Sequence, residues 1–251
     1  MPRTTLITAV HDRADLLPEA IESALAQTDT DFELIVWDDG STDDSLAVAE
    51  QYAARDPRIR VMSAPNQGFT AVLNAALAHS DSPYFGLVDS DDRSARTALA
   101  ETLPIIEADP DIGLVFTNHR RIDRAGVDIV PGWNTDIPYS PDLLMVKQMV
   151  FHFRLFSREI FNETGAYDPA YPHAEDYDMM LRMSEICDIV KHPGVLYDYR
   201  IYDGMISVEK RTEQITSSAH AMDVALKRRG VSDGLVLHVD EQGRFSLTNR
   251  P

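Results

Sequence analysis

The sequence has little cysteine, few basic residues and no long hydrophobic run. Cys187 is the only cysteine among 251 residues, which excludes an internal disulfide and a cysteine-rich zinc site and favours a reducing compartment. The 41 acidic residues outnumber the 23 basic ones, and the net charge of −18 disfavours nucleic acid as a partner. No segment approaches the ~20 apolar residues of a transmembrane helix. We therefore expect a cytoplasmic protein with no transmembrane segment, which leaves peripheral association with the inner face of the membrane open.

Glycine-rich phosphate-binding loops are also missing. The first apolar run ends at Val10 and leads into AVHDRAD, which contains neither a Walker loop nor the Gly-x-Gly-x-x-Gly turn of dinucleotide-binding domains. Hydride transfer with NAD is therefore not indicated. If the chain binds phosphates, another group must hold them, and a metal ion is the obvious candidate.

Hydrophobic residues make up 44% of the chain, which is enough to bury the core of one large domain. Short apolar runs that suit strands buried on both faces alternate with segments of helical periodicity. The runs are Leu6–Val10, Leu34–Trp37, Ile59–Met62 and Tyr84–Val88. This order predicts an α/β fold with a mainly parallel central sheet flanked by helices.

Acidic side chains follow two of the predicted strands. Asp38 and Asp39 come after the second, and Asp89, Asp91 and Asp92 come after the fourth. Because ligands of open α/β sheets bind at the carboxyl ends of the strands, we expect both groups to face one crevice. Oxygen ligands without nearby thiols suit Mg²⁺ or Mn²⁺, which commonly also bind substrate phosphates. The alternative at each position is an ordinary solvated turn.

A second acidic pair lies in the other half of the chain. The segment HAEDYDMMLR predicts a loop followed by a helix, with Glu175 and Asp176 in its first turn. Acidic residues stabilise a helix at this end, which is one explanation of the pair. A carboxylate that accepts a proton from an attacking hydroxyl is the other.

In combination, the motifs resemble the family 2 glycosyltransferases with the GT-A fold. The resemblance covers roughly residues 4–207. It depends, in chain order, on LITAVHDRADLLPEAIESALAQT, FELIVWDDGSTDDS, PNQG followed by Asn74, YFGLVDSDD, HAEDYDMMLR and YRIYDGMIS. The resemblance implies a GT-A sheet with a small antiparallel element on the acceptor side. It also implies inverting transfer of a sugar from a nucleotide-diphosphate donor to a hydroxyl of a glycan or glycolipid, as in polysaccharide biosynthesis.

By the same resemblance, UDP is the first candidate for the nucleotide, with dTDP and GDP behind it. The donor-binding residues would be Ala9, His11, Arg13, Asp39, Asn66, Gly68, Asn74, Asp89 and Ser90. Asp91 would bind Mn²⁺ or Mg²⁺ as the end of the family's Asp-x-Asp motif, with Asp92 as a further ligand. Asp176 would be the catalytic base, with Glu175 as the second choice.

Two positions depart from the family pattern. Leu73 precedes Asn74 where relatives often carry an arginine, so one contact with the diphosphate is either missing or supplied by Arg13 or Arg93. Tyr202 stands where a metal-binding histidine is frequent. Asp203 or His173 can replace that histidine, and otherwise the ion has fewer protein ligands.

The resemblance divides the chain into a catalytic domain, 1–206, and an extension, 207–251. Within the domain, 1–118 would bind the nucleotide sugar and 119–206 would supply the acceptor side and the base. We expect a strand over Phe151–Phe156, and Trp133 and Tyr139 either line the acceptor site or pack a loop. The sequence of the extension predicts a helix ending at Gly230, followed by a hairpin. The extension either covers the domain or joins two protomers in an oligomer.

Three other classes of protein explain parts of the pattern. A sugar nucleotidyltransferase would share the sheet and the metal, but it should carry a glycine-rich loop after the first strand. A phosphoacceptor receiver domain would be about half as long. A non-catalytic nucleotide-sugar binding protein is the nearest alternative, because binding residues alone can be kept without turnover.

Overall fold

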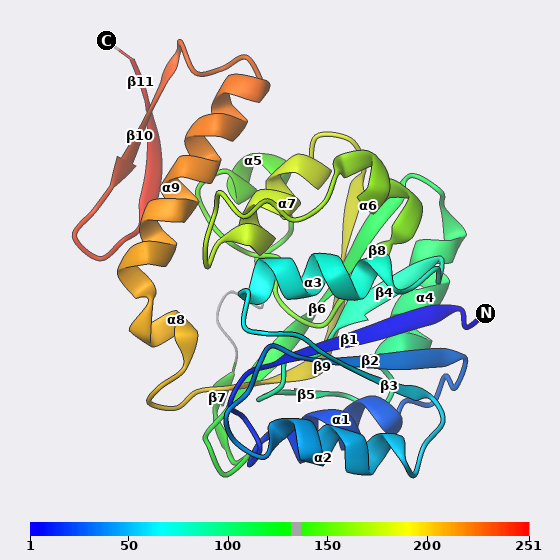
Figure 1. The fold of residues 1–251 in the computed structure, drawn as a ribbon. Helices are drawn as coiled ribbons and strands as arrows, with labels where there is room; N and C mark the ends of the chain where they lie inside the picture. Colours follow the sequence, from blue (N-terminus) through cyan, green and yellow to red (C-terminus); the bar gives the residue numbers. More distant parts are fainter. Residues whose placement is uncertain (132–136, 251) are drawn as a thin grey trace.

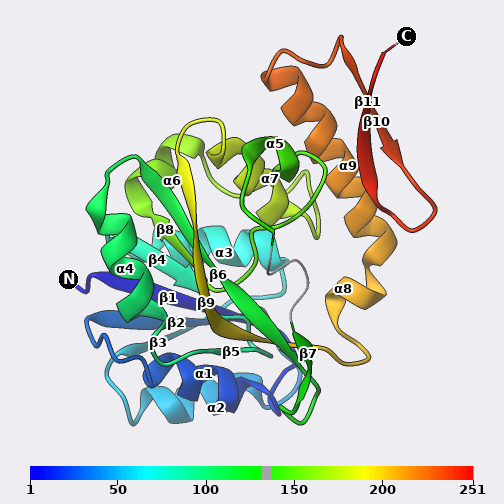
Figure 2. The same ribbon diagram turned by 180° about the vertical axis from the view of Figure 1, so that it is seen from behind.

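A computed structural model of the chain describes residues 1–131 and 137–250. Within these residues a curled sheet of nine strands carries helices on both faces, and a two-stranded sheet lies near the C-terminus (Figures 1 and 2). The large sheet comprises β1 Thr4–Val10, β2 Phe32–Asp38, β3 Ile59–Ser63, β4 Tyr84–Leu87, β5 Arg93–Ser94, β6 Ile112–Ile122, β7 Asp128–Pro131, β8 Arg154–Ser157 and β9 Asp188–Arg200. The small sheet comprises β10 Leu235–Val239 and β11 Phe245–Asn249.

The strand order of the large sheet is β3-β2-β1-β4-β8-β6-β9-β5, with β7 paired to β6. The four strands β3, β2, β1 and β4 are mutually parallel. β8 is antiparallel to both β4 and β6, whereas β9 runs parallel to β6. Because β1, β2 and β4 are parallel neighbours, their carboxyl ends open at the same edge of the sheet, as the sequence predicts.

The helices divide between the two faces of the sheet. They are α1 Leu17–Leu25, α2 Ser45–Ala53, α3 Phe69–Ala78, α4 Ala98–Ala108, α5 Pro141–Leu144, α6 Arg158–Thr164, α7 Glu175–Met183, α8 Ile206–Glu209 and α9 Arg211–Arg228. α1, α2 and α4 cover one face, and α3, α6 and α7 cover the other. Alternate strand residues point to opposite faces, so Leu6 and Ile7 of β1 belong to two different cores.

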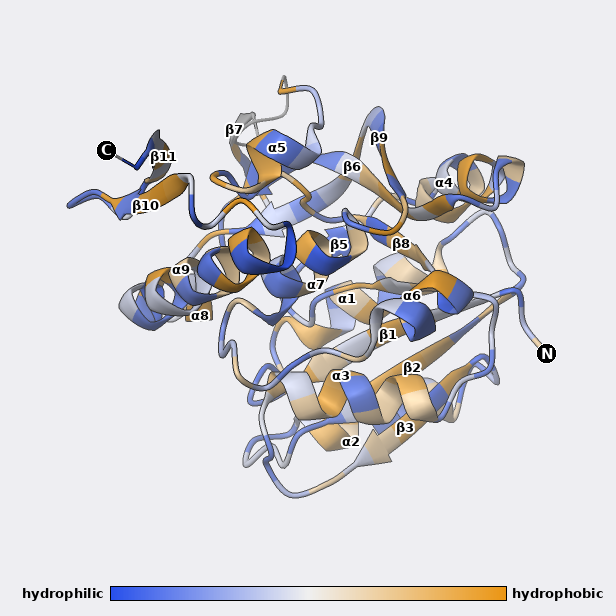
Figure 3. Ribbon diagram, turned by 90° about the horizontal axis from the view of Figure 1, so that it is seen from above, coloured by the Kyte–Doolittle hydropathy of each residue, from blue (hydrophilic) through white to orange (hydrophobic). Residues whose placement is uncertain are grey.

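Burial explains why the short apolar runs form strands. β1 and β2 are buried along nearly their whole length, and in Figure 3 they are predominantly in the hydrophobic colour whereas most connecting loops are hydrophilic. α1 begins at Leu17 with Pro18 in its first turn, where the missing N–H costs nothing. The expected mainly parallel sheet with flanking helices is confirmed.

One strand is shorter than expected. β8 begins at Arg154 rather than Phe151, because residues 152 and 153 form a bend. β6 continues to Ile122 and forms a hairpin with β7. Trp133 lies outside the described residues. Tyr139 packs with its ring edge-on to Phe116 in the core, with ring centroids 6.0 Å apart, which is the packing alternative.

The C-terminal extension forms the predicted helix and hairpin. α9 ends at Arg228, and Gly230 follows with a φ of 68°, a conformation that favours glycine at a helix end. α9 packs against α7, and the β10–β11 hairpin extends from the main body at the opposite side from the N-terminus (Figures 1 and 2). In the described residues, no helix has the length and apolar character needed to cross a membrane.

Candidate active site

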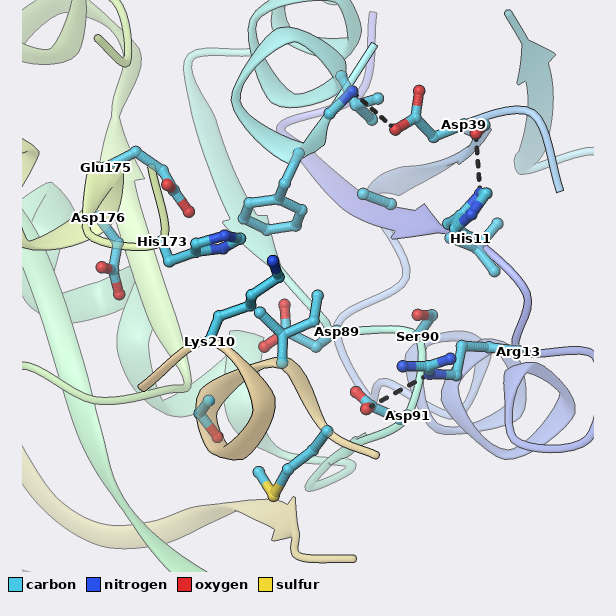
Figure 4. A pocket seen from close by; sticks show the side chains of 18 of the residues that line it. His11, Arg13, Asp39, Asp89, Ser90, Asp91, His173, Glu175, Asp176 and Lys210 are labelled. Carbon is cyan, nitrogen blue, oxygen red and sulfur yellow. Dashed lines mark hydrogen bonds and ion pairs between the residues drawn. The ribbon is translucent and has the colours of Figure 1, made fainter. Parts of the chain in front are cut away.

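A cavity of about 610 Å³ opens at the carboxyl ends of β1, β2 and β4. It is lined by eleven of the thirteen residues predicted for the site, namely Ala9, His11, Arg13, Asp39, Asn66, Gly68, Asp89, Ser90, Asp91, Glu175 and Asp176. Figure 4 shows His11 and Asp39 on one side, Glu175 and Asp176 on the other, and Asp89, Ser90 and Asp91 between them. The predicted residues therefore surround one space, although they come from segments far apart in the sequence.

The first wall is built around Asp39, whose side chain is bonded to the loop after β3. Its two carboxylate oxygens accept the backbone N–H groups of Gln67 at 2.8 Å and Gly68 at 3.0 Å. Its carbonyl oxygen lies 3.0 Å from Nδ1 of His11. Asp39 thus holds together three loops of this wall, and its carboxylate is largely occupied by protein donors.

The glycine of the DDGS motif allows this close packing of loops. A Cβ on Gly40 would lie 2.6 Å from the backbone nitrogen of Asn66, which is a severe clash. The φ of Gly40, 68°, is also one that other residues rarely adopt. Oδ1 of Asp43 accepts the N–H of Ser45, the first residue of α2, at 2.9 Å.

The acidic segment after β4 forms the floor between the two walls. The Tyr202 hydroxyl donates to Oδ2 of Asp91 at 2.7 Å, and Nε of Arg13 lies 4.0 Å from the same oxygen. The backbone N–H of Asp89 donates to the Tyr197 hydroxyl at 3.0 Å. Burial, with the nearby charge of Asp91, raises the pKa of Asp89 to about 7.

Two predicted residues lie outside the cavity lining. Asp92 is buried, and its Oδ1 accepts the backbone N–H of Arg200 at 2.7 Å. Asn74 bonds the backbone of Tyr167 twice, donating from Nδ2 to the carbonyl at 2.8 Å and accepting the N–H at 3.1 Å. The contacts of both side chains are therefore internal to the protein.

The opposite wall carries the carboxylate pair at the start of α7. Oδ2 of Asp176 accepts Nη1 of Arg154 at 3.0 Å and Nε2 of Gln148 at 3.2 Å. Glu175 is buried, and burial together with the charge of Asp176 raises its pKa to about 7. Arg182 pairs with Asp178 one turn earlier on α7, and its guanidinium also donates to the carbonyls of residues 164–166, which anchors α7 to the preceding segment.

A buried arginine and a histidine connect the floor to the acid pair. Arg154 has only 3% of its side chain exposed, and its Nη2 contacts Nε2 of His152. Nε2 of His152 lies 3.3 Å from Oδ2 of Asp89. Burial lowers the pKa of His152 well below its usual value, so the ring is neutral. A series of side-chain contacts therefore spans the cavity, from Asp89 through His152 and Arg154 to Asp176.

The fit of a divalent cation can be tested against these side chains. Among residues 1–131 and 137–250 there is no group of three or more His, Cys, Asp or Glu side chains arranged to hold an ion. Asp89 and Asp91, however, both line the cavity, and Mg²⁺ typically takes one or two carboxylates and completes its coordination with phosphates and water. The residues fit an ion that binds together with a phosphorylated ligand.

Sequence reasoning did not identify Arg154, His152 or Lys210, although all three lie at this cavity or in its lining. The only signal for the first two is that polar residues alternate with aromatic ones in FHFRLF. A buried arginine in such a segment is unusual unless it is paired. Lys210 lies in the extension, where no motif marks it.

The chain is similar in sequence to known proteins. The model of the glycosyl transferase family 2 matches residues 5–165. Over 92% of its length the chain is 31% identical to a chondroitin synthase of Escherichia coli, and over 92% it is 28% identical to a hyaluronan synthase of Pasteurella multocida. It spans 34% and 24% of those two proteins.

Solved structures share the fold. The mannosyltransferase PcManGT from Pyrobaculum calidifontis, in complex with GDP-Man and Mn²⁺, superposes with a TM-score of 0.71 at 19% identity over 90% of this chain and 64% of that one. TarS of S. aureus, residues 1–349 in complex with UDP, gives a TM-score of 0.69 at 16% identity over 92% of this chain and 70% of that one.

Proposed function

Because the chain belongs to the glycosyl transferase family 2, we propose that it transfers a sugar from a nucleotide-diphosphate donor to an acceptor hydroxyl with inversion. One observation carries the proposal. A single cavity has the acidic end of β4 as its floor and the Glu175–Asp176 pair on the wall opposite Asp39. Such a cavity can hold a donor between Asp39, which would bind the nucleotide, and the Glu175–Asp176 pair, which would accept the proton of the acceptor hydroxyl.

The donor would lie across the cavity with its nucleoside at the His11 and Asp39 wall. Ala9, Asn66 and Gly68 complete that wall. The sugar would then approach Asp89 and Ser90. The named complexes of the related structures contain GDP-Man and UDP, and we take a UDP-sugar as the first donor to test.

Asp176 is the base in this proposal. Inversion requires the acceptor hydroxyl to attack from the side opposite the leaving diphosphate, and a carboxylate must accept its proton at hydrogen-bond distance. Arg154 and Gln148 bind Oδ2 of Asp176 and so fix the orientation of the carboxylate. Glu175, with a pKa raised to about 7, is the second candidate for the same role.

A divalent cation would neutralise the charge that develops on the departing diphosphate. Asp91 would bind this cation directly, and Asp89 would act on it indirectly, through the bound donor. The Tyr202 hydroxyl and Arg13 already contact Asp91. These contacts keep the carboxylate in place before a ligand binds. They also compete with a cation for Oδ2, so we expect weak cation binding in the absence of donor.

The acceptor would be a glycan, since the similar curated proteins include a chondroitin synthase and a hyaluronan synthase. It would bind on the side formed by 119–206, which contains α7 and its acid pair. Residues 1–118 would hold the donor.

A thermal-shift panel tests the proposal. UDP-, GDP- and dTDP-sugars are added with and without Mn²⁺ to the wild type and to Asp91→Ala. We expect at least one donor to raise the Tm, and to do so more strongly with Mn²⁺ in the wild type only. If the rise in Tm with donor is the same with and without Mn²⁺ and in Asp91→Ala, the role of the cation is contradicted. If no donor raises the Tm, donor binding is contradicted.

A further inference from the structure

The turn between α8 and α9 belongs to the same cavity. Glu209, Lys210 and Gln214 line it together with Asp89 and Glu175, although they lie beyond the residues matched by the family model, 5–165. Lys210 is the single residue that separates the two helices. In Figure 4 its ammonium group projects into the cavity, with His173 and Asp89 around it.

Contacts with the loop before α7 hold this turn in place. Nε2 of Gln214 donates to the carbonyl of His173 at 3.1 Å. Nε2 of His173 also lies 3.5 Å from Oε2 of Glu213. His173 precedes Glu175 by two residues, so the start of α9 is attached directly to the wall that carries the acid pair.

The charges in the cavity show why a lysine at this place matters. A bound diphosphate would add negative charge to a space already lined by Asp39, Asp89, Asp91, Glu175 and Asp176. Two of the arginines that line it, Arg154 and Arg200, are engaged with the protein. Arg154 binds Asp176. Arg200 binds the carbonyls of residues 91 and 124 and the carboxylate of Glu19.

Lys210 is differently placed from these arginines. Its Nζ donates to Oε1 of Glu213 at 2.9 Å, and the two side chains are 45% and 54% exposed. An exposed pair of this kind contributes little to stability, so exchanging the carboxylate for a phosphate costs little. The ammonium group can therefore bind a ligand without breaking a buried contact.

We infer that Lys210 binds the distal phosphate of the donor's diphosphate, so that the C-terminal extension completes the donor site. This inference rests on the proposed function. Lys210 would lie on the side of the diphosphate that faces the extension, and Arg13 and a cation at Asp91 would lie on the floor. The distal phosphate, which carries the sugar before transfer, would thus be bound from two sides.

Isothermal titration with UDP and UMP, in the presence of Mn²⁺, tests the inference. The variants are Lys210→Ala, Lys210→Arg and the control Lys227→Ala, which removes a lysine paired with Asp223 on the same helix. We expect Lys210→Ala to weaken UDP binding about tenfold and to leave UMP binding unchanged within about twofold. Lys210→Arg should recover most of the UDP affinity, and Lys227→Ala should match the wild type.

The results separate this inference from the proposed function. If the wild type binds UDP, and Lys210→Ala either binds it equally well or loses UMP and UDP affinity to the same extent, the phosphate contact is wrong and the proposed function is unaffected. If the wild type binds no nucleoside diphosphate, including GDP and dTDP, the proposed function itself fails.

Discussion

Arg154 is the residue on which the geometry of the candidate base depends. Its guanidinium is buried and lies between Asp176 on one side and His152, next to Asp89, on the other. An arginine presents a planar set of donors that a lysine cannot reproduce. We therefore regard Arg154 as a positioning residue that acts through Asp176.

Arg154→Lys should keep the positive charge but lose this geometry. We expect the kcat of sugar transfer or donor hydrolysis to fall at least ~10-fold, with the KM for donor changed by less than ~3-fold, because the base loses its orientation while the donor wall is untouched. The control is Arg182→Lys, which affects an arginine bound to Asp178 of the same helix. Arg182→Lys should lower the Tm without a fall in kcat at constant KM. If its kcat falls as much as that of Arg154→Lys, a positioning role for Arg154 is contradicted.

Ionisation of the buried Glu175 carboxyl group should lower the free energy of unfolding at neutral and alkaline pH. Its pKa in the folded protein, about 7, lies above the usual value of 4.5, so the folded state binds more protons between these values and stability falls as the pH rises through this window. Glu175→Gln should therefore raise the free energy of unfolding at pH 8 by about 3 kcal/mol, and the gain should vanish near pH 4. Chemical denaturation at both pH values measures it.

The exposed Glu163→Gln is the matched control for this measurement, since surface substitutions usually change stability by less than ~0.5 kcal/mol. An equal gain for Glu175→Gln at pH 4 and pH 8 would mean that the effect does not come from ionising a buried carboxyl group.

The positions of individual site residues were predictable only where a motif marks them. Asp39, Asp91 and Asp176 stand in recognisable segments, and all three line the cavity. The contacts of Asp39 with residues 67 and 68 were not predictable, because they depend on how closely two loops approach. Arg154 carries no motif, and its burial follows from strand pairing alone.

At the scale of elements, periodicity predicted most strands and helices of the first half. Each buried parallel strand is a short apolar run, and each helix has an apolar stripe, which are strong local signals. β8 was predicted too long, because Phe151 and Phe153 continue the apolar alternation beyond the residues that pair with β4 and β6. Pairing partners, which come from distant segments, decide where such a strand begins.

Asn74 connects two elements, and its contacts predict an effect on stability. Asn74→Ala removes the two hydrogen bonds from α3 to the backbone of Tyr167, which should cost about 2 kcal/mol and lower the Tm by roughly 5 °C. Donor affinity should change by less than about twofold. Asn118→Ala, which removes one exposed bond to the carbonyl of Pro193, should have a much smaller effect on Tm.

A clear loss of donor affinity in Asn74→Ala, with the Tm unchanged, would instead support the donor-binding role that the family resemblance assigns to this residue.

At the scale of the whole molecule, the sheet order brings the site together. The order β3-β2-β1-β4-β8-β6-β9-β5 places the ends of β1, β2 and β4 beside residues that lead into β8 and follow β9. The parallel first half and its acidic edge follow from the alternation of elements in the sequence. The insertion of β8 beside β4, and the return of the extension to the cavity through Gln214, depend on contacts between segments that share no local pattern.

The whole site can be tested by measuring donor binding and donor hydrolysis together in the wild type and in Asp176→Asn. With Mn²⁺ and the donor that gives the largest thermal shift, we expect the variant to bind the donor within about threefold of the wild type. Its turnover should fall at least ~100-fold, since general base catalysis contributes about that much or more. Equal turnover in both proteins would contradict Asp176 as the base, and no metal-dependent hydrolysis in either would indicate a nucleotide-sugar binding protein.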